Sequence, residues 1–383
     1  MSEHQVVAFR AIDNPVAEKN LAYMRQQSSR AEITPWSFDN EYHYGDFRGD
    51  VFEMLRRGYD IHLHYADFGI RKLLLRLPNG LPDKAAIKPY LNEDGLEFKP
   101  DKQGSGGTLY IEPYLETGEL GALWKIDELI KRLLPLRAEI LDGDLRPLYL
   151  AHLAVARDGN HEPDKTKESP VPAGLGNLTG AQQALAEFYG LDDSLIAAAA
   201  KGAPPLPAKA GVGNDYAGWL KGQSQSAKDA WLAEWMSDPS AGTRAEMIAA
   251  FRKSQNLPSW PTVRLHRTIA ELRVSADAIQ KESERKATEY RARARALRFA
   301  EMAADPTETL RETEKHVKER TGSAYTKIAK LLVELREALV GTMQSGLAER
   351  QAQKLKAENP TLRLLVSELR KEGFLPKQRT LPI

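Results

Sequence analysis

Cysteine is absent from the 383 residues of the sequence. Its absence excludes disulfide bonds, thiolate zinc sites and cysteine nucleophiles together. A chain that uses none of these is compatible with a reducing compartment. We therefore expect a cytoplasmic protein.

Long hydrophobic runs are also missing. No stretch approaches the roughly 18 consecutive apolar residues of a membrane span. The first residues, MSEHQVVAFRAIDNP, have neither the basic nor the apolar region of a signal peptide. We therefore expect no membrane partner.

The sequence also lacks an excess of charge of either sign. The 54 lysines and arginines nearly balance the 53 aspartates and glutamates, which leaves a formal net charge of +1. No field over the whole molecule then attracts nucleic acid or a membrane surface. Any electrostatic partner must be met by a local patch.

Common catalytic signatures are missing too. The sequence has neither an H-E-x-x-H zinc motif nor a G-x-S-x-G nucleophile elbow. The segment KQGSGGTLYI has the glycines of a phosphate loop, but it lacks the lysine of G-x-x-x-x-G-K-[ST] and continues as a strand pattern. It predicts a loop between strands, and we expect no cofactor.

What is present is a change from mixed to helical patterns along the chain. QVVAFRAI, YDIHLHY, IRKLLLRL and TLYIEPYL have strand patterns, with helical patterns between them. The later part of the chain is almost entirely helical in pattern. This predicts an α+β N-terminal domain followed by a mostly α-helical C-terminal region.

Two stretches rich in proline, glycine and charge predict flexible connections. The segment LTGAQQALAEFYGL between them opens with an expected N-cap at Thr179. The expected division is an α+β domain with exit helices at 1–157, a linker at 158–178, a small helical segment at 179–202, a linker at 203–215, and a helical domain with long charged helices at 216–383.

The helix pattern SAYTKIAKLLVELREAL has an apolar stripe at spacings of three and four residues. Such a stripe needs a packing partner. We expect that partner to be another helix of the same bundle, with a second protein or a second copy of the chain as the alternative. The stripe consists of Tyr325, Ile328, Leu332, Leu335 and Leu339.

The most unusual chemistry lies in DNEYHYGDFRGD and YDIHLHYADFG. In a strand, Asp60, His62 and His64 share one face, and the same alternation places His43 beside Glu41. If these strands paired, imidazoles and carboxylates would meet in a set that suits zinc, iron or manganese. The alternative is a half-buried sheet face on which the histidines form hydrogen bonds. His43, Asp60, His62 and His64 are therefore candidate metal ligands.

A second acidic pattern is similar to that of metal-dependent nucleases. Asp83 is followed by Glu97 and Lys99 in an E-x-K arrangement, in which carboxylates hold a metal ion and the lysine helps to activate water. Asp83 follows a turn pattern, and Lys99 precedes a proline. A surface strand and two turns are the alternative.

Basic side chains gather in EYRARARALRF. A strip of this kind can bind phosphate groups. The alternative is a solvated helix face, neutralised in part by glutamates one or two turns earlier. The basic strip consists of Arg291, Arg293, Arg295 and Arg298.

Three longer phrases carry a family resemblance: EYHYGDFRGDVFEMLRRGYDIHLHYADFGIRKLLLRLP, LTGAQQALAEFYGLDDSLIAAAA and AYTKIAKLLVELREAL. The chain resembles an uncharacterised bacterial protein family with no established activity, over most of its length. The resemblance implies a bacterial, cytosolic protein of two parts, with helicase and SWIM zinc-finger proteins as genetic neighbours. It implies no catalytic or binding residue.

The leading hypothesis is a non-enzymatic accessory or adaptor protein of a bacterial multi-protein system. Its helical C-terminal region would dock other proteins, with helicase or ATPase components of the same system as candidate partners. The first alternative is a metal-dependent hydrolase or nuclease that uses the His- and Asp-rich N-terminal sheet. The second is weak nucleic-acid binding through the basic strip.

Overall fold

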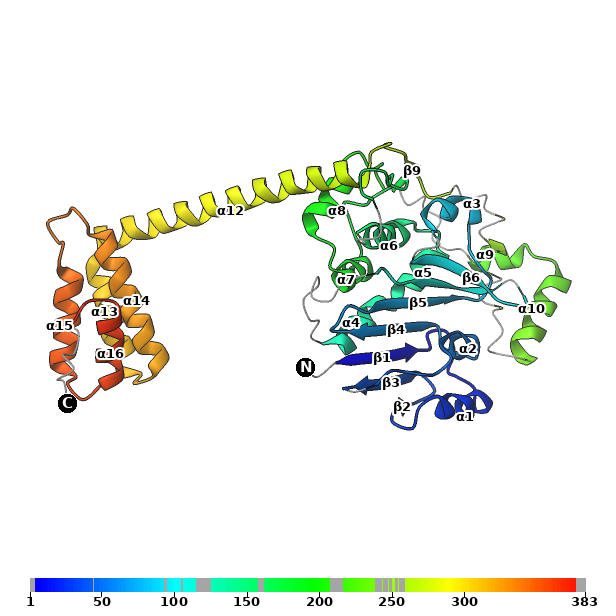
Figure 1. The fold of residues 1–383 in the computed structure, drawn as a ribbon, viewed down its shortest axis with the longest axis horizontal. Helices are drawn as coiled ribbons and strands as arrows, with labels where there is room; N and C mark the ends of the chain where they lie inside the picture. The colour runs from blue at the N-terminus through cyan, green and yellow to red at the C-terminus, as the bar shows by residue number, and fades with distance from the viewer. Residues whose placement is uncertain are drawn as a thin grey trace. The chain divides into compact units, whose positions relative to one another are not determined.

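The structure is a computed structural model, in which the chain divides into two compact units, Met1–Gln280 and Lys281–Ile383 (Figure 1). The residues that it describes are 4–43, 45–92, 95–104, 106–114, 125–157, 162–206, 216–237 and 259–376, with single positions at 243, 247, 250, 251 and 254.

An antiparallel sheet forms the centre of the first unit (Figure 1). Within the described residues it has seven strands in the order β2-β3-β1-β4-β5-β7-β6. β1 therefore lies between β3 and β4, and each strand of the pattern found in the sequence pairs with a neighbour of opposite direction. The strands are β1 (Gln5–Arg10), β2 (Glu32–Ile33), β3 (Ser37–Tyr42), β4 (Ile61–Ala66), β5 (Arg71–Leu77), β6 (Leu96–Pro100) and β7 (Gly107–Ile111).

Helices cover the two faces of this sheet. One face packs on α1 and α2, which contribute buried side chains such as Met24 and Met54. The other face packs on the helices from α4 to α8, around side chains such as Leu63, Leu73 and Tyr149. These helices are α1 (Glu18–Gln27), α2 (Val51–Arg56), α4 (Ile126–Leu133), α5 (Pro135–Leu141), α6 (Arg146–Ala156), α7 (Gly180–Tyr189) and α8 (Asp193–Ala200).

Six further elements lie wholly within the described part of the first unit. β8 pairs with β9, which brings together two parts of the chain that are far apart in the sequence. The elements are α3 (Lys84–Ile87), the 3-10 helix η1 (Lys88–Tyr90), β8 (Val171–Pro172), α9 (Tyr216–Lys221), α10 (Gln225–Ser237) and β9 (Thr262–Val263).

Local sequence fixes the ends of α7. The Thr179 side chain accepts a hydrogen bond from the Gln182 backbone, and the Gln182 side chain accepts one from the Thr179 backbone, which makes a capping box. Gly190 ends the helix with a φ of 61°, a left-handed conformation that favours glycine. The predicted N-cap at Thr179 is confirmed.

The structure divides the chain at a different place from the proline-rich stretch at 158–178. Glu168, Ser169 and Val171 are buried, and the Ala173 N–H donates to the Pro261 carbonyl at 2.8 Å. α7 and α8, expected in a separate segment at 179–202, share the core of the first unit. Residues 158–161 and most of the expected linker at 203–215 lie outside the described residues.

The second unit is a bundle of helices with its own core (Figure 1). The stripe of α14 is buried there, and α14 packs against α13, α15 and α16. The expectation of a partner within the same bundle is confirmed. The helices are α13 (Pro306–Lys318), α14 (Gly322–Ala338), α15 (Leu347–Glu358) and α16 (Arg363–Lys371).

α12 (Ile269–Ala304) is a single helix that belongs to both units in sequence. Leu272 and Ala276 lie in the core of the first unit, and Met302 lies in the core of the second. Residues 280–298 are all exposed. The α+β N-terminal part followed by a mostly helical C-terminal region, as the sequence predicts, is confirmed.

None of the helices in the described residues combines the length and the hydrophobicity that crossing a membrane requires.

Candidate functional site

The strand order separates the histidines that the sequence grouped together. Because β1 lies between β3 and β4, His43 is not on a neighbouring strand of His62 and His64. Its Nε2 lies 3.6 Å from Glu41 Oε1, and the Nε2 of His4 lies 2.8 Å from the same oxygen. The sequence missed His4, because only the pairing of β1 with β3 brings it to this place.

Asp60 lies at the other end of β1, where its N–H donates to the Arg10 carbonyl. Its carboxylate accepts a 2.6 Å hydrogen bond from the Ile12 N–H and lies 3.2 Å from Arg137 Nη2. Burial raises the pKa of Asp60, although Arg137 acts in the opposite direction. These contacts give Asp60 the role of joining α5 to the sheet.

His62 is buried in the core beneath α1 and α2, 1% exposed. Its ring lies 4.3 Å from that of Phe9, centroid to centroid, and neither of its ring nitrogens forms a hydrogen bond with the described residues. Burial lowers its pKa well below the ordinary range, and the positive charges of His64 and Lys72 act in the same direction. The Ala8 backbone acts in the opposite direction and raises the pKa of His62, although its geometry with the ring is not that of a normal hydrogen bond. His62 is therefore neutral at pH 7.

His64 lies on the same face, with 6.4 Å between its ring centroid and that of His62. Its Nε2 is 3.0 Å from Gln5 Oε1. Burial lowers its pKa to about 4, helped by Lys72 and opposed by Asp46. Nowhere in the described residues do three histidine, aspartate or glutamate side chains gather closely enough to hold a metal ion.

The nuclease-like residues are also divided between two roles. Asp83 caps α3, since its Oδ1 accepts a 3.0 Å hydrogen bond from the Ala86 N–H, and its Oδ2 accepts one from the Ser259 hydroxyl at 2.6 Å. Glu97 and Lys99 lie on β6, where Lys99 Nζ is 3.8 Å from Glu97 Oε2. Asp83 thus has partners other than the E-x-K pair.

The basic strip of α12 is partly neutralised within the second unit. Arg295 Nη2 lies 2.5 Å from Glu337 Oε2, and Arg298 Nη2 lies 2.6 Å from Glu334 Oε2. Both glutamates belong to α14. Arg291 and Arg293 are exposed and form no ion pair with another described residue. Half of the strip therefore serves packing between helices.

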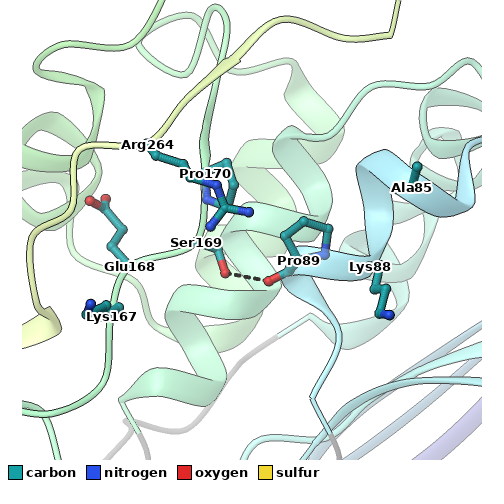
Figure 2. Close-up of a pocket in the computed structure, with 8 residues that line it drawn as sticks. All are labelled: Ala85, Lys88, Pro89, Lys167, Glu168, Ser169, Pro170 and Arg264. Carbon is teal, nitrogen blue, oxygen red and sulfur yellow. Dashed lines mark hydrogen bonds between the residues drawn. The ribbon is translucent and has the colours of Figure 1, made fainter.

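A pocket of 430 Å³ lies on the first unit, where three segments meet (Figure 2). The first segment comprises α3 and η1, the second precedes β8, and the third follows β9. The lining residues are Ala85, Lys88, Pro89, Lys167, Glu168, Ser169, Pro170 and Arg264.

Hydrogen bonds hold these three segments together. The Ser169 hydroxyl donates to the Pro89 carbonyl at 2.9 Å, as the dashed line in Figure 2 shows, and the Tyr90 hydroxyl donates to the Pro170 carbonyl at 2.7 Å. The third segment is held by the pairing of β8 with β9 and by an isolated bridge between Lys167 and Thr268. The pocket walls are therefore fixed by backbone and buried groups.

The pocket's carboxylate is neutralised from inside the protein. Arg267 Nε lies 2.5 Å from Glu168 Oε2, and Arg267 Nη2 lies 2.8 Å from Oε1. The buried Tyr149 hydroxyl also donates to this carboxylate, and burial, followed by the charge of Glu168, raises the pKa of Tyr149. In Figure 2 the carboxylate lies on the side away from Pro89.

The other charged groups of the pocket are cations. Lys88, Lys167 and Arg264 are exposed, and none of them forms an ion pair with a residue that the structure describes. Sequence reasoning missed this cluster, because its members lie far apart along the chain. No local motif connects them, and the pairing of β8 with β9 and the bridge between Lys167 and Thr268 bring Arg264 and Lys167 to one pocket.

The chain matches no protein-family model, no curated protein and no solved structure.

Proposed function

We propose that the protein is a non-enzymatic adaptor that docks other proteins through its helices. The observation that supports this is the surface of α10. No residue of this helix is buried, although it carries two tryptophans, a leucine and a methionine. A solvent-exposed cluster of large apolar side chains is typical of a protein interaction site.

The exposed apolar stripe of α10 consists of Leu232, Trp235 and Met236, at spacings of three and four residues. Their exposed fractions are 56%, 56% and 72%. Because residues at this spacing lie on one face of a helix, they form a continuous edge. A helix that lays such an edge into the apolar groove of a partner is a common mode of recognition.

The aromatic contacts of α9 orient this stripe. Trp231 of α10 lies 5.5 Å from Trp219 of α9, centroid to centroid, and Trp219 lies 5.7 Å from Phe251. These rings take one side of α10 for packing within the first unit. Trp235 lies one turn beyond Trp231 on the same side of the helix, with Leu232 and Met236 beside it, and all three stay exposed. A partner of the same multi-protein system, with a helicase or ATPase component as the first candidate, would cover this stripe.

Co-purification from the native host, followed by quantitative mass spectrometry, tests the proposal. We expect one or more proteins to be enriched with the wild-type chain and to be lost, about tenfold, with the variant L232E/W235E/M236E, because charges cannot enter an apolar groove without a cost. The matched control S226E/A230E/S237E carries the same charges on the opposite side of α10, where all three residues are exposed and none lies three or four positions from a stripe residue.

Recovery of the chain alone at every salt concentration would contradict the proposal. Equal losses with the stripe variant and the control would contradict the assignment to this stripe. The hydrolase alternative has less support, since the structure distributes His43, Asp60 and His62 over three separate places.

A further inference from the structure

The cation pocket of the first unit, defined as Lys88, Lys167, Arg264 and the backbone that carries them, has an excess of positive charge. Its only carboxylate among the described lining residues, Glu168, is already bound by Arg267 and Tyr149. Three cations that line one pocket and form no ion pair with a described residue give it a positive potential, which attracts an anion.

The fixed backbone of the pocket walls distinguishes this site from a group of lysines on an open surface. Arg264 follows β9 directly, and β9 is held to β8 through the pairs Val171–Val263 and Pro172–Thr262. Figure 2 shows the Arg264 guanidinium beside Ser169 and Pro170, above the bond that joins Ser169 to Pro89. The backbone that carries its planar fork is therefore fixed beside the pocket, and the fork can form two parallel hydrogen bonds to one anion.

The two lysines lie on either side of Arg264 in Figure 2, at opposite ends of the pocket. Lys88 begins η1, and Lys167 forms the bridge with Thr268. A lysine ammonium on its flexible stem acts as a movable point charge. One guanidinium and two movable ammonium groups suit a phosphate monoester, which carries up to two negative charges on its oxygens.

The volume indicates that the ligand is larger than phosphate alone. At 430 Å³ the pocket falls within the range of about 300 to 1,000 Å³ that is usual for small-molecule sites. The rings of Pro89 and Pro170 and the methyl group of Ala85 provide apolar surface beside the cations. We propose that this pocket binds a small organic phosphate of nucleotide size, with Arg264 binding its phosphate group and with Lys88 and Lys167 adding the positive charge that attracts it.

Isothermal titration calorimetry of the full-length chain at low salt tests this, with AMP, inorganic phosphate and adenosine as probes. We expect AMP to bind with a Kd below about 1 mM, inorganic phosphate to bind more weakly at the same place, and adenosine not to bind. The variant K167E/R264E should weaken AMP binding at least about tenfold, since it reverses two of the three cations.

The matched control K19E/K131E makes the same change in net charge on exposed helix positions away from the pocket. Its affinity for AMP should stay within about twofold of the wild type. R264Q provides a milder second variant, which removes the charge of the fork without introducing an opposite one. It should weaken AMP binding while leaving the melting temperature unchanged.

Four results would overturn the proposal. The first is that neither AMP nor inorganic phosphate binds at millimolar concentration, and the second is that adenosine binds as tightly as AMP. The third is that K19E/K131E weakens AMP binding as much as K167E/R264E does. The fourth is that a short single-stranded RNA without a terminal phosphate binds more tightly than AMP. The last result would assign the pocket to phosphodiesters of nucleic acid instead.

Discussion

A histidine whose ring nitrogens are buried and without hydrogen bonds can exist in the core only as the neutral imidazole. His62 is in this position, next to Phe9 and on the same face as His64. Burial of the charged form is costly, and Lys72 adds repulsion to both rings. The two histidines therefore couple the stability of the first unit to pH.

We expect the first unit to lose stability as the pH falls from about 6.5 to about 4. In the unfolded chain an imidazole has a pKa near 6.5, whereas in the folded chain the pKa of His64 is about 4 and burial lowers the pKa of His62 as well. The unfolded state therefore binds more protons over this range. The contribution of His64 alone is roughly 3 kcal/mol.

Urea unfolding at a series of pH values, followed by tryptophan fluorescence, measures this loss. The variant H62F/H64Q should show a flatter dependence on pH, because it removes both titrating groups. His43→Gln is the control: His43 is exposed beside Glu41, so its replacement should leave the wild-type slope. Identical slopes in all three proteins would contradict the assignment.

Among the helices, α12 has arginines with two different roles. Arg295 and Arg298 bind glutamates of α14, while Arg291 and Arg293 remain on the exposed stretch. On that stretch Arg285 pairs with Glu282 and Glu289 at the spacings that stabilise a helix. Few positive charges are then left for a phosphate backbone.

We expect nucleic acid to bind weakly, without sequence preference and with strong dependence on salt. If Arg291 and Arg293 meet phosphates, the logarithm of the binding constant should fall by about 0.7 to 0.9 per contact for each unit of log salt. R291E/R293E should then flatten the slope in a fluorescence-anisotropy titration. The control R311E/K315E reverses two exposed cations of α13 and should flatten it less.

Tight binding that survives high salt, or a slope that R291E/R293E leaves unchanged, would show that this strip does not carry the interaction.

Local elements could be predicted from the sequence because their causes are local. The capping box at Thr179, the stripe of α14 and the alternation of β4 all depend on residues within a few positions of one another. The partners of strands depend on distant residues instead. For this reason the meeting of His43 with His4 and the insertion of β1 between β3 and β4 were not foreseen.

Prediction of the candidate site from the sequence has the same limit, because it depends on contacts between distant residues. The sequence named four metal-ligand candidates on the assumption that their strands pair. The structure keeps His62 and His64 on one face of β4, but it separates His43 from them by β1 and pairs Asp60 with Arg137. Conversely, Lys88, Lys167 and Arg264 share no pattern, yet they line one pocket. Composition also marked 158–178 as a linker, since a local reading cannot detect that β8 pairs with a strand some 90 residues later.

At the scale of the whole molecule, the two units have separate hydrophobic cores. The six tryptophans all precede residue 281, so their fluorescence reports on the first unit alone. Far-UV circular dichroism reports on the helices of both. The two units can therefore be followed independently in the intact chain.

We expect Leu332→Ala to lower the stability of the second unit by about 2 to 5 kcal/mol, because Leu332 is fully buried in the bundle. The circular dichroism transition should acquire an earlier phase, while the fluorescence transition stays in place. Lys330→Ala, an exposed change on the same helix, should shift neither by more than about 0.5 kcal/mol. A fluorescence transition that moves together with circular dichroism would contradict independent cores.

The pairing of β8 with β9 also sets an order of events on the ribosome. The strands of the large sheet are all synthesised before residue 112, and β8 follows soon after. β9 comes about 90 residues later, a delay of roughly 5 to 20 seconds at usual translation rates. During that interval the nascent chain has its sheet and Lys167 but not Arg264. The hollow between them is therefore assembled late, and no nascent chain that ends before β9 can have it.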